Sequence, residues 1–174
     1  MNTRRRTQSA PLERPSARGL RVAVVRSRYN AAVVDGLLAG AREALRQLGA
    51  TDRDVVLTDV PGAFELPLAA AGAARSGRFD AIVALGAVIK GETDHYEHIA
   101  REACHGLAAV SRETGVPVGL GVLTVAREEQ ALARSAPGPD NKGAEAARAA
   151  VAMVHILRSL GGRGRAARLR RKAR

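Results

Sequence analysis

LRVAVVRSRYNAAVVDGLLAGAREALRQL, residues 20–48, contains a short apolar run followed by a helical pattern, and this order decides the fold class. Residues 20–25 are rich in valine and have the length of a strand, which predicts a buried β-strand. Residues 32–48 repeat apolar side chains at helical spacing, and Gly49 follows as a stop signal, so we expect an α-helix there. One strand followed by one helix is the building unit of an α/β fold.

The same order recurs along the chain. We expect further strands at residues 55–60, 80–85 and 116–123, and further helices at residues 65–76, 94–114, 128–135 and 142–160. Because strands alternate with helices, the sequence predicts a flavodoxin-like fold, a three-layer α/β/α sandwich with a central four-stranded parallel sheet. Such sheets bind ligands at the carboxyl ends of their strands, in the loops that lead into the helices.

The basic charge is concentrated at the two ends of the chain. The formal net charge is +11, of which residues 1–18 contribute +4 and residues 158–174 contribute +8, so the centre is close to neutral. We expect one domain over residues 19–160, with basic, disordered tails at residues 1–18 and 161–174. A nucleic-acid or membrane partner, which this net charge would usually indicate, is therefore not indicated for the domain itself.

The sequence gives little sign of a membrane or of export. No apolar run approaches the roughly 20 residues that cross a bilayer. The N-terminus lacks the apolar segment of a secretory signal, although its Arg and Ser content overlaps with that of a transit peptide. We expect a cytoplasmic protein, with import into an organelle as the alternative. The single cysteine, Cys104, excludes an internal disulfide.

Candidate functional residues follow the first two strands. Tyr29 could lie flat against a substrate ring, or it could cap the core. Pro61 and Gly62 predict a sharp turn that exposes backbone N–H groups. Glu65 follows this turn and could be functional or simply a favourable charge in the first turn of a helix.

The loop after the third strand carries the clearest chemistry. Gly91 permits close backbone approach, Thr93 offers a hydroxyl, and the next helix supplies unpaired N–H groups, a combination that suits a phosphate. Asp94 and Glu97 also have the spacing of a capping box, which fits a plain helix start. His95 is the best general acid or base, because imidazole titrates near neutral pH.

The remaining candidates are weaker. His98, His105 and His155 are more typical of structural histidines, and a metal site at His95 and His98 lacks further ligands at suitable spacing. Arg134, beyond the fourth strand, could hold an anion with two hydrogen bonds or could be a solvated surface arginine.

Taken together, these loops resemble the lumazine synthase family. The matching stretches are SRYN at 27–30, VPGAFELP at 60–67, ALGAVIKGETDHY at 84–96, GVLT at 121–124, EQA at 129–131, and NKG at 141–143 with Glu145. They occur in the family's order and spacing over about residues 19–157.

The resemblance implies a transferase that acts in the penultimate step of riboflavin biosynthesis. Its reaction would condense 5-amino-6-(D-ribitylamino)uracil with 3,4-dihydroxy-2-butanone 4-phosphate, giving 6,7-dimethyl-8-ribityllumazine, phosphate and water. It implies no metal and no redox cofactor.

The resemblance also implies roles for individual residues. His95 would transfer protons and Glu145 would orient it. The pyrimidine and ribityl chain would be bound by Tyr29, Asn30, Ala63, Phe64, Glu65, Ala87, Val88, Ile89, Leu120 and Lys142. The phosphate would be bound by Gly91, Glu92 and Thr93, with Arg134 from a neighbouring subunit.

Three departures from the family pattern bear on affinity. Tyr29 stands where relatives often have Phe or Trp, which keeps a stacking ring but adds a hydroxyl. Leu120 stands where several relatives have Phe, so one pocket wall loses an aromatic face, and Val125 replaces a common Thr. None of these changes removes a group that the chemistry needs.

The resemblance implies a homo-oligomer, either a pentamer or an icosahedral shell of twelve pentamers, with the active site between subunits. The short loop at residues 135–140 favours the shell, for which riboflavin synthase is a candidate guest.

Two other functions remain open. The first is a shell-forming scaffold whose basic tails bind nucleic acid or an acidic guest protein, although the tails lack aromatic residues for base stacking and could simply be solvated. The second is a flavodoxin-like protein that binds a flavin or a nucleotide without catalysis.

Overall fold

The structure, a computed structural model, describes residues 15–161. Residues 1–14 and 162–174 lie outside the described residues, and so does most of the two predicted tails. Within the described part, the helices are α1 (Ala31–Gln47), α2 (Leu66–Arg75), α3 (His95–Thr114), α4 (Glu128–Ser135) and α5 (Lys142–Gly161). Short 3-10 turns, η1 (Asp52–Asp54) and η2 (Ala63–Glu65), flank the second strand.

A single parallel sheet forms the centre of the described residues. It consists of β1 (Val22–Ser27), β2 (Val55–Val60), β3 (Ala81–Ile89) and β4 (Val118–Val125), in the order β2-β1-β3-β4, and every pair is parallel. This order matches the start of the flavodoxin-like order 2-1-3-4-5. The predicted four-stranded parallel sheet is confirmed.

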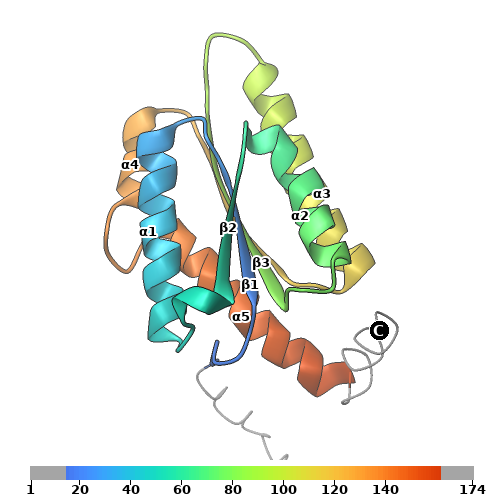
Figure 1. Cartoon of the computed structure of the whole chain (residues 1–174). Helices are drawn as coiled ribbons and strands as arrows, with labels where there is room; N and C mark the ends of the chain where they lie inside the picture. The colour runs from blue at the N-terminus through green and yellow to red at the C-terminus, as the bar shows by residue number, and fades with distance from the viewer. Residues whose placement is uncertain (1–14, 162–174) are drawn as a thin grey trace, which may run out of the picture.

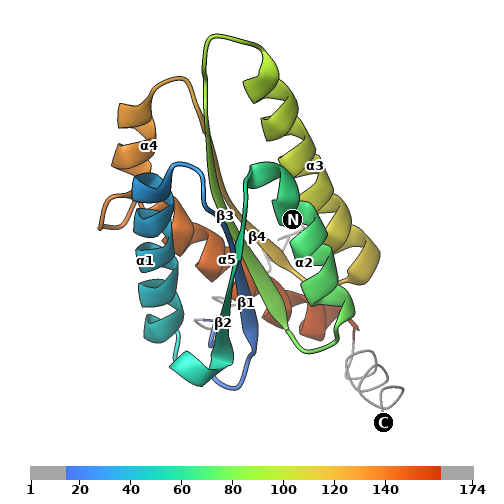
Figure 2. The same ribbon diagram turned by 45° about the horizontal axis from the view of Figure 1, so that its top comes forward.

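Helices cover both faces of the sheet, which confirms the three-layer prediction (Figures 1 and 2). Side chains alternate along β1: Val22 and Val24 pack with α1, α4 and α5, whereas Ala23 and Val25 pack with α2 and α3. Alternation follows from the two-residue period of a strand, and a strand buried on both faces is apolar throughout. The core is therefore divided by the sheet into two apolar layers.

The third strand is longer than the sequence predicts. It was expected to end at residue 85, but β3 continues to Ile89, because Gly86–Ile89 pair in register with Val122–Val125 of β4. The pairing partner is remote in the chain, so local pattern does not reveal the extension. It brings the end of β3 directly to the loop at residues 90–94.

The packed structure begins before the expected domain boundary. Residues 15–18, which composition assigns to the N-terminal tail, lie between α1 and α5. Ala17 is fully buried, and its N–H donates to the Leu48 carbonyl at 2.8 Å. On the other side, Nε2 of His155 lies 2.6 Å from the carbonyl oxygen of Ser16. This segment is fixed to the end of the molecule where the strands begin.

Among the helices that the structure describes, none combines the length and the apolar character that crossing a membrane requires.

Candidate active site

A cavity of about 450 Å³ lies at the carboxyl ends of β1, β2 and β3. β1 and β3 are neighbours whose following helices, α1 and α3, cover opposite faces of the sheet, and ligands bind at such a switch point in α/β sheets. The volume is that of a small-molecule site. The cavity is lined by Tyr29, Asn30, Gly62, Ala63, Phe64, Glu65, Ala87, Val88, Ile89, Gly91, Thr93, His95, Tyr96 and Ile99.

Two exposed aromatic rings stand at this cavity. Tyr29 is 71% exposed and Phe64 is 57% exposed, in a chain with four aromatic residues. Tyr29 therefore does not cap the core, which was the alternative to a binding role. Its ring lies close to the backbone of Gly62, where an added Cβ would come within 3.1 Å of it. Both rings offer apolar surface to a ligand or to another protein chain.

Asn30 joins the ends of β1 and β3. Its backbone is left-handed, with φ 57° and ψ 48°, a conformation that asparagine tolerates better than most residues. Its Nδ2 donates to the carbonyl of Ala87 at 2.8 Å. This hydrogen bond therefore joins two walls of the cavity, and it does so independently of any contact that Asn30 makes with a ligand.

Glu65 has a structural partner at the cavity wall. Its Oε2 accepts a hydrogen bond from the N–H of Gly62 at 2.9 Å and closes the turn η2. The sequence left open whether this carboxylate is functional or stabilises a helix start. The structure shows the stabilising contact and also places the residue on the cavity.

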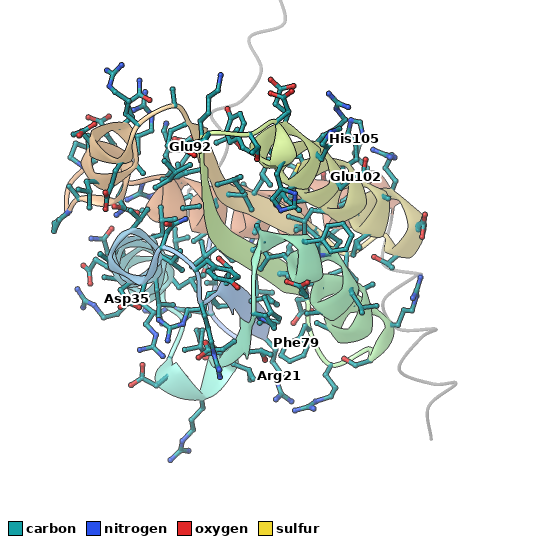
Figure 3. All side chains as sticks on the ribbon, turned by 90° about the horizontal axis from the view of Figure 1, so that it is seen from above. Arg21, Asp35, Phe79, Glu92, Glu102 and His105 are labelled. Carbon is teal, nitrogen blue, oxygen red and sulfur yellow. The ribbon has the colours of Figure 1, made fainter. Side chains whose placement is uncertain are left out.

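The loop at residues 90–94 leaves room for an anion. Gly91 and Thr93 are exposed and line the cavity, and an added Cβ at Gly91 would have no neighbour within 4 Å. The capping box, which was the alternative interpretation of Asp94 and Glu97, does not form, because the side chain of Asp94 makes no capping hydrogen bond to α3. The N–H groups that begin α3 are thus not taken up by that carboxylate, and such groups attract anions. Glu92 is exposed on the same loop (Figure 3) and does not line the cavity.

His95 is exposed at the first position of α3 and lines the cavity. The same turn of helix brings Tyr96 and Ile99 to the cavity, and neither was proposed from the sequence as a site residue. For Ile99, which follows His95 by four residues, helical spacing was the available signal. Among residues 15–161, no three histidine, cysteine or carboxylate side chains are grouped as metal ligands would be.

Three further predicted residues lie at a second pocket, of about 210 Å³, along the edge strand β4. It is lined by Leu120, Gly121, Val122, Leu123, Thr124, Val125, Arg134 and Lys142. Leu120 is half exposed there. The guanidinium of Arg134 donates to the carbonyl of Gln130 at 3.0 Å, and no carboxylate of the described residues forms an ion pair with it.

Within the chain, Glu145, which was predicted to orient His95, forms an ion pair with Lys142 at the start of α5. The structure therefore divides the predicted residues between two places. One holds the histidine, the aromatic rings and the glycine loop, and the other holds Leu120, Arg134 and Lys142, with Glu145 beside Lys142.

In a comparison with known protein families, the chain matches a family model. The model of the family described as 6,7-dimethyl-8-ribityllumazine synthase matches residues 19–158, which is most of the chain.

Proposed function

Because the chain belongs to the 6,7-dimethyl-8-ribityllumazine synthase family, we propose that it is the transferase that catalyses this family's reaction. It condenses 5-amino-6-(D-ribitylamino)uracil with 3,4-dihydroxy-2-butanone 4-phosphate, and it releases 6,7-dimethyl-8-ribityllumazine, phosphate and water. We place it in the cytoplasm, in the riboflavin pathway.

One observation carries this proposal. A single cavity collects His95, the open loop at Gly91 and Thr93, and the exposed ring of Tyr29. The reaction needs a group that exchanges protons, a place for a phosphate and a surface for a flat pyrimidine. A protein that only binds a flavin or a nucleotide needs the last two features but has no use for an imidazole beside them.

The residues of the cavity have different roles, which follow from their side-chain chemistry. Tyr29 and Phe64 hold the pyrimidine and the ribityl chain against the backbone of residues 87–89. Gly91 and Thr93 bind the phosphate with backbone and hydroxyl groups. His95 moves protons during imine formation, phosphate elimination and ring closure, an effect typically worth about 10²–10⁴-fold. Holding two reactants in contact contributes several kcal/mol more, on the order of 7–11 in the best cases.

The active site is completed by a second subunit. The exposed edge of β4, with Leu120, Arg134 and Lys142, faces the cavity of the next subunit and brings a cation to the phosphate loop. Glu145, next to Lys142, contacts the neighbour's His95 across the same subunit interface. Contacts of this head-to-tail kind close into rings. We propose a pentamer, alone or as the unit of an icosahedral shell.

The direct test mixes the full chain with both substrates and follows the absorbance of the lumazine. His95→Ala is expected to lower kcat by about 10²–10⁴-fold, because only the proton-transfer contribution is lost. His98→Ala is the matched control: it is also an exposed histidine of α3 but does not line the cavity, so its rate should equal that of the unmodified chain.

Sedimentation of both variants checks that they assemble alike. An unchanged rate in His95→Ala would remove the imidazole from the mechanism. Failure of the unmodified chain to form any lumazine would refute the proposed function.

A further inference from the structure

We infer that Ile99 on α3 is a specificity-determining residue, which receives the alkyl end of the ketone phosphate and limits it to a methyl group. This role of Ile99 rests on the proposed function and deepens it, because it names the part of the cavity that distinguishes one ketone from another. Three observations support it: the order of groups along α3, the distance between them, and the packing that holds Ile99 in place.

The start of α3 and the loop before it line the cavity with three kinds of group in a fixed order. Gly91 and Thr93, in the loop, form the open place for an anion. His95 is the first residue of α3, and Ile99 follows it by four residues on the same face of the helix. Along this wall, an anion site is therefore followed by an imidazole and then by an apolar side chain.

The ketone substrate has its groups in the same order. In 3,4-dihydroxy-2-butanone 4-phosphate the phosphate is at one end, the ketone lies between, and the other end is an unsubstituted methyl group. A molecule that is anchored by its phosphate at Gly91 and Thr93 thus passes His95 with its reacting carbons and ends in the methyl group. The side chain of Ile99 is a suitable neighbour for that methyl group, because contact between them removes apolar surface from water.

The spacing along the helix fits the length of this molecule. Ile99 lies four residues beyond His95, which is about 6 Å at a rise of 1.5 Å per residue. The bonds from the phosphorus to the methyl carbon span about 6 Å as well when the molecule is extended. A ketone with a longer alkyl end would therefore meet the side chain of Ile99.

Packing behind Ile99 restricts its movement. Its side chain is half-buried and packs against the apolar layer on the α2 and α3 side of the sheet, and the side chain of Tyr96 does the same. This layer includes Ala63 and Val88, which are buried and also line the cavity. Because protein interiors are close-packed, a side chain that is supported in this way has little room to yield to a larger ligand.

The aromatic rings that we propose for the pyrimidine come from other elements. Tyr29 follows β1 and Phe64 lies in η2, whereas Ile99 lies on α3. The ring of Tyr29 is close to the backbone of Gly62, at the start of η2. A change at Ile99 should therefore alter the selection of the ketone and leave the KM for the pyrimidine unchanged.

The test compares the butanone phosphate with the homologue in which an ethyl group replaces the methyl group. The full chain condenses each ketone with the same pyrimidine, and kcat/KM for each is measured from the absorbance of the lumazine that forms. The unmodified chain should prefer the methyl ketone by about 10–200-fold, the range for one extra methylene in a hydrophobic pocket. Ile99→Ala should lower this preference by about 10-fold or more, because the shorter side chain leaves space for the extra carbon.

Cys104→Ala is the matched control. Cys104 is also half-buried on α3 but does not line the cavity, so this variant should keep the rate and the preference of the unmodified chain. The KM for the pyrimidine is measured in parallel for every chain. If Ile99→Ala does not fold, as judged by circular dichroism, Ile99→Val takes its place, and the loss of one methylene should still lower the preference severalfold.

Four results would overturn the role of Ile99 and leave the proposed function intact. The unmodified chain could use both ketones with similar kcat/KM, or Ile99→Ala could keep the preference. Cys104→Ala could lose as much preference as Ile99→Ala, which would mean that α3 as a whole acts. A rise confined to the KM for the pyrimidine would place Ile99 beside the other substrate. Failure to form any lumazine from the butanone phosphate is a different outcome, because it would refute the proposed function and the role of Ile99 with it.

Discussion

At the scale of single residues, Ser27 is the exception to a well-satisfied core. Its side chain is 1% exposed, and its Oγ is the buried side-chain atom without a hydrogen-bond partner among the described residues. It lies at the end of β1, beside Gly86. A buried hydroxyl without a partner costs free energy, because it has lost water and gained nothing in return.

We expect Ser27→Ala to leave the free energy of unfolding unchanged or to raise it, by up to about 1–3 kcal/mol. Ser135→Ala is the matched control, because Ser135 is buried as well but its hydroxyl donates to the carbonyl of Leu132 at 3.2 Å. That change should lower the free energy of unfolding by about 0.5–1.5 kcal/mol. Urea unfolding of both variants measures these two changes in the free energy of unfolding. Equal destabilisation would show that Ser27 has a partner in solution.

At the scale of elements, α1 and α5 approach each other closely at Gly143. An added Cβ there would lie 2.0 Å from the carbonyl oxygen of Leu37. Asn141, buried just before α5, holds the contact: its Oδ1 accepts from the N–H of Ala144, and its Nδ2 donates to the carbonyl of Gly36 on α1 at 3.1 Å. This packing places Lys142 at the pocket along β4, with Glu145 beside Lys142.

We expect Gly143→Ala to lower the free energy of unfolding by about 1–3 kcal/mol or more, because the helices must separate. Gly72→Ala on α2 is the control, since an added Cβ there meets nothing within 4 Å. In a helix interior that change should stabilise by about 0.5–1 kcal/mol. Thermal unfolding followed by circular dichroism distinguishes the expected loss of stability in Gly143→Ala from the expected gain in Gly72→Ala. A stable Gly143→Ala variant would mean that α1 and α5 are not held at this distance.

A second contact between elements is the ion-pair group of Arg26. Its Nε donates to Oδ1 of Asp59 on β2 at 2.7 Å, and its Nη1 binds Asp35 on α1. The hydrogen bond from Arg26, with the attraction of its charge, lowers the pKa of Asp59 below the ordinary value of 3.8. The folded state therefore favours the carboxylate. The contribution of this ion pair to the free energy of unfolding is complete above about pH 4–5. It is lost as the pH falls through the lowered pKa of Asp59.

We expect Asp59→Asn to lower the Tm at pH 7, and the difference from the unmodified chain should shrink as the pH is lowered below about 4. Glu102→Gln, on the exposed outer face of α3 (Figure 3), is the control and should change the Tm little at either pH. A difference that grows at low pH would contradict the assigned pKa direction.

At the scale of the whole molecule, the proposed active site needs two subunits. His95 lines the cavity of one chain, and Arg134 lies at the separate pocket along β4. The proposed site therefore requires that the two residues come together where one subunit meets the next. Complementation between inactive variants tests this arrangement directly.

Subunits of His95→Ala and Arg134→Ala, dissociated, mixed in equal amounts and reassembled, should regain about a quarter of the unmodified activity, because a quarter of random neighbours combine both intact residues. The unmodified chain mixed with the double variant should also give about a quarter. If both residues served one site within a single chain, the first mixture would stay inactive and the second would reach about half.

Much of the fold could be predicted from the sequence, because the period of apolar residues is a local property. The valine run at residues 20–25 and the helical repeat at 32–48 fixed the type of element, and α4 matched its predicted range without change. The end of β3 could not be predicted, since its pairing with β4 joins remote parts of the chain. The chemistry of Tyr29 and His95 was visible in their residue types, but their place on one cavity was not.

The sequence by itself determined the alternation of strands and helices, the loops that carry the chemistry and the concentration of charge at the ends. These depend on side-chain type and on spacing within one element. Tertiary structure alone decided that Glu65 bonds to Gly62, that Asp94 leaves the start of α3 uncapped, and that Arg134 and Lys142 lie away from His95. The physical reason is that these outcomes depend on distances between groups that packing brings together or holds apart, and spacing along the chain does not specify such distances.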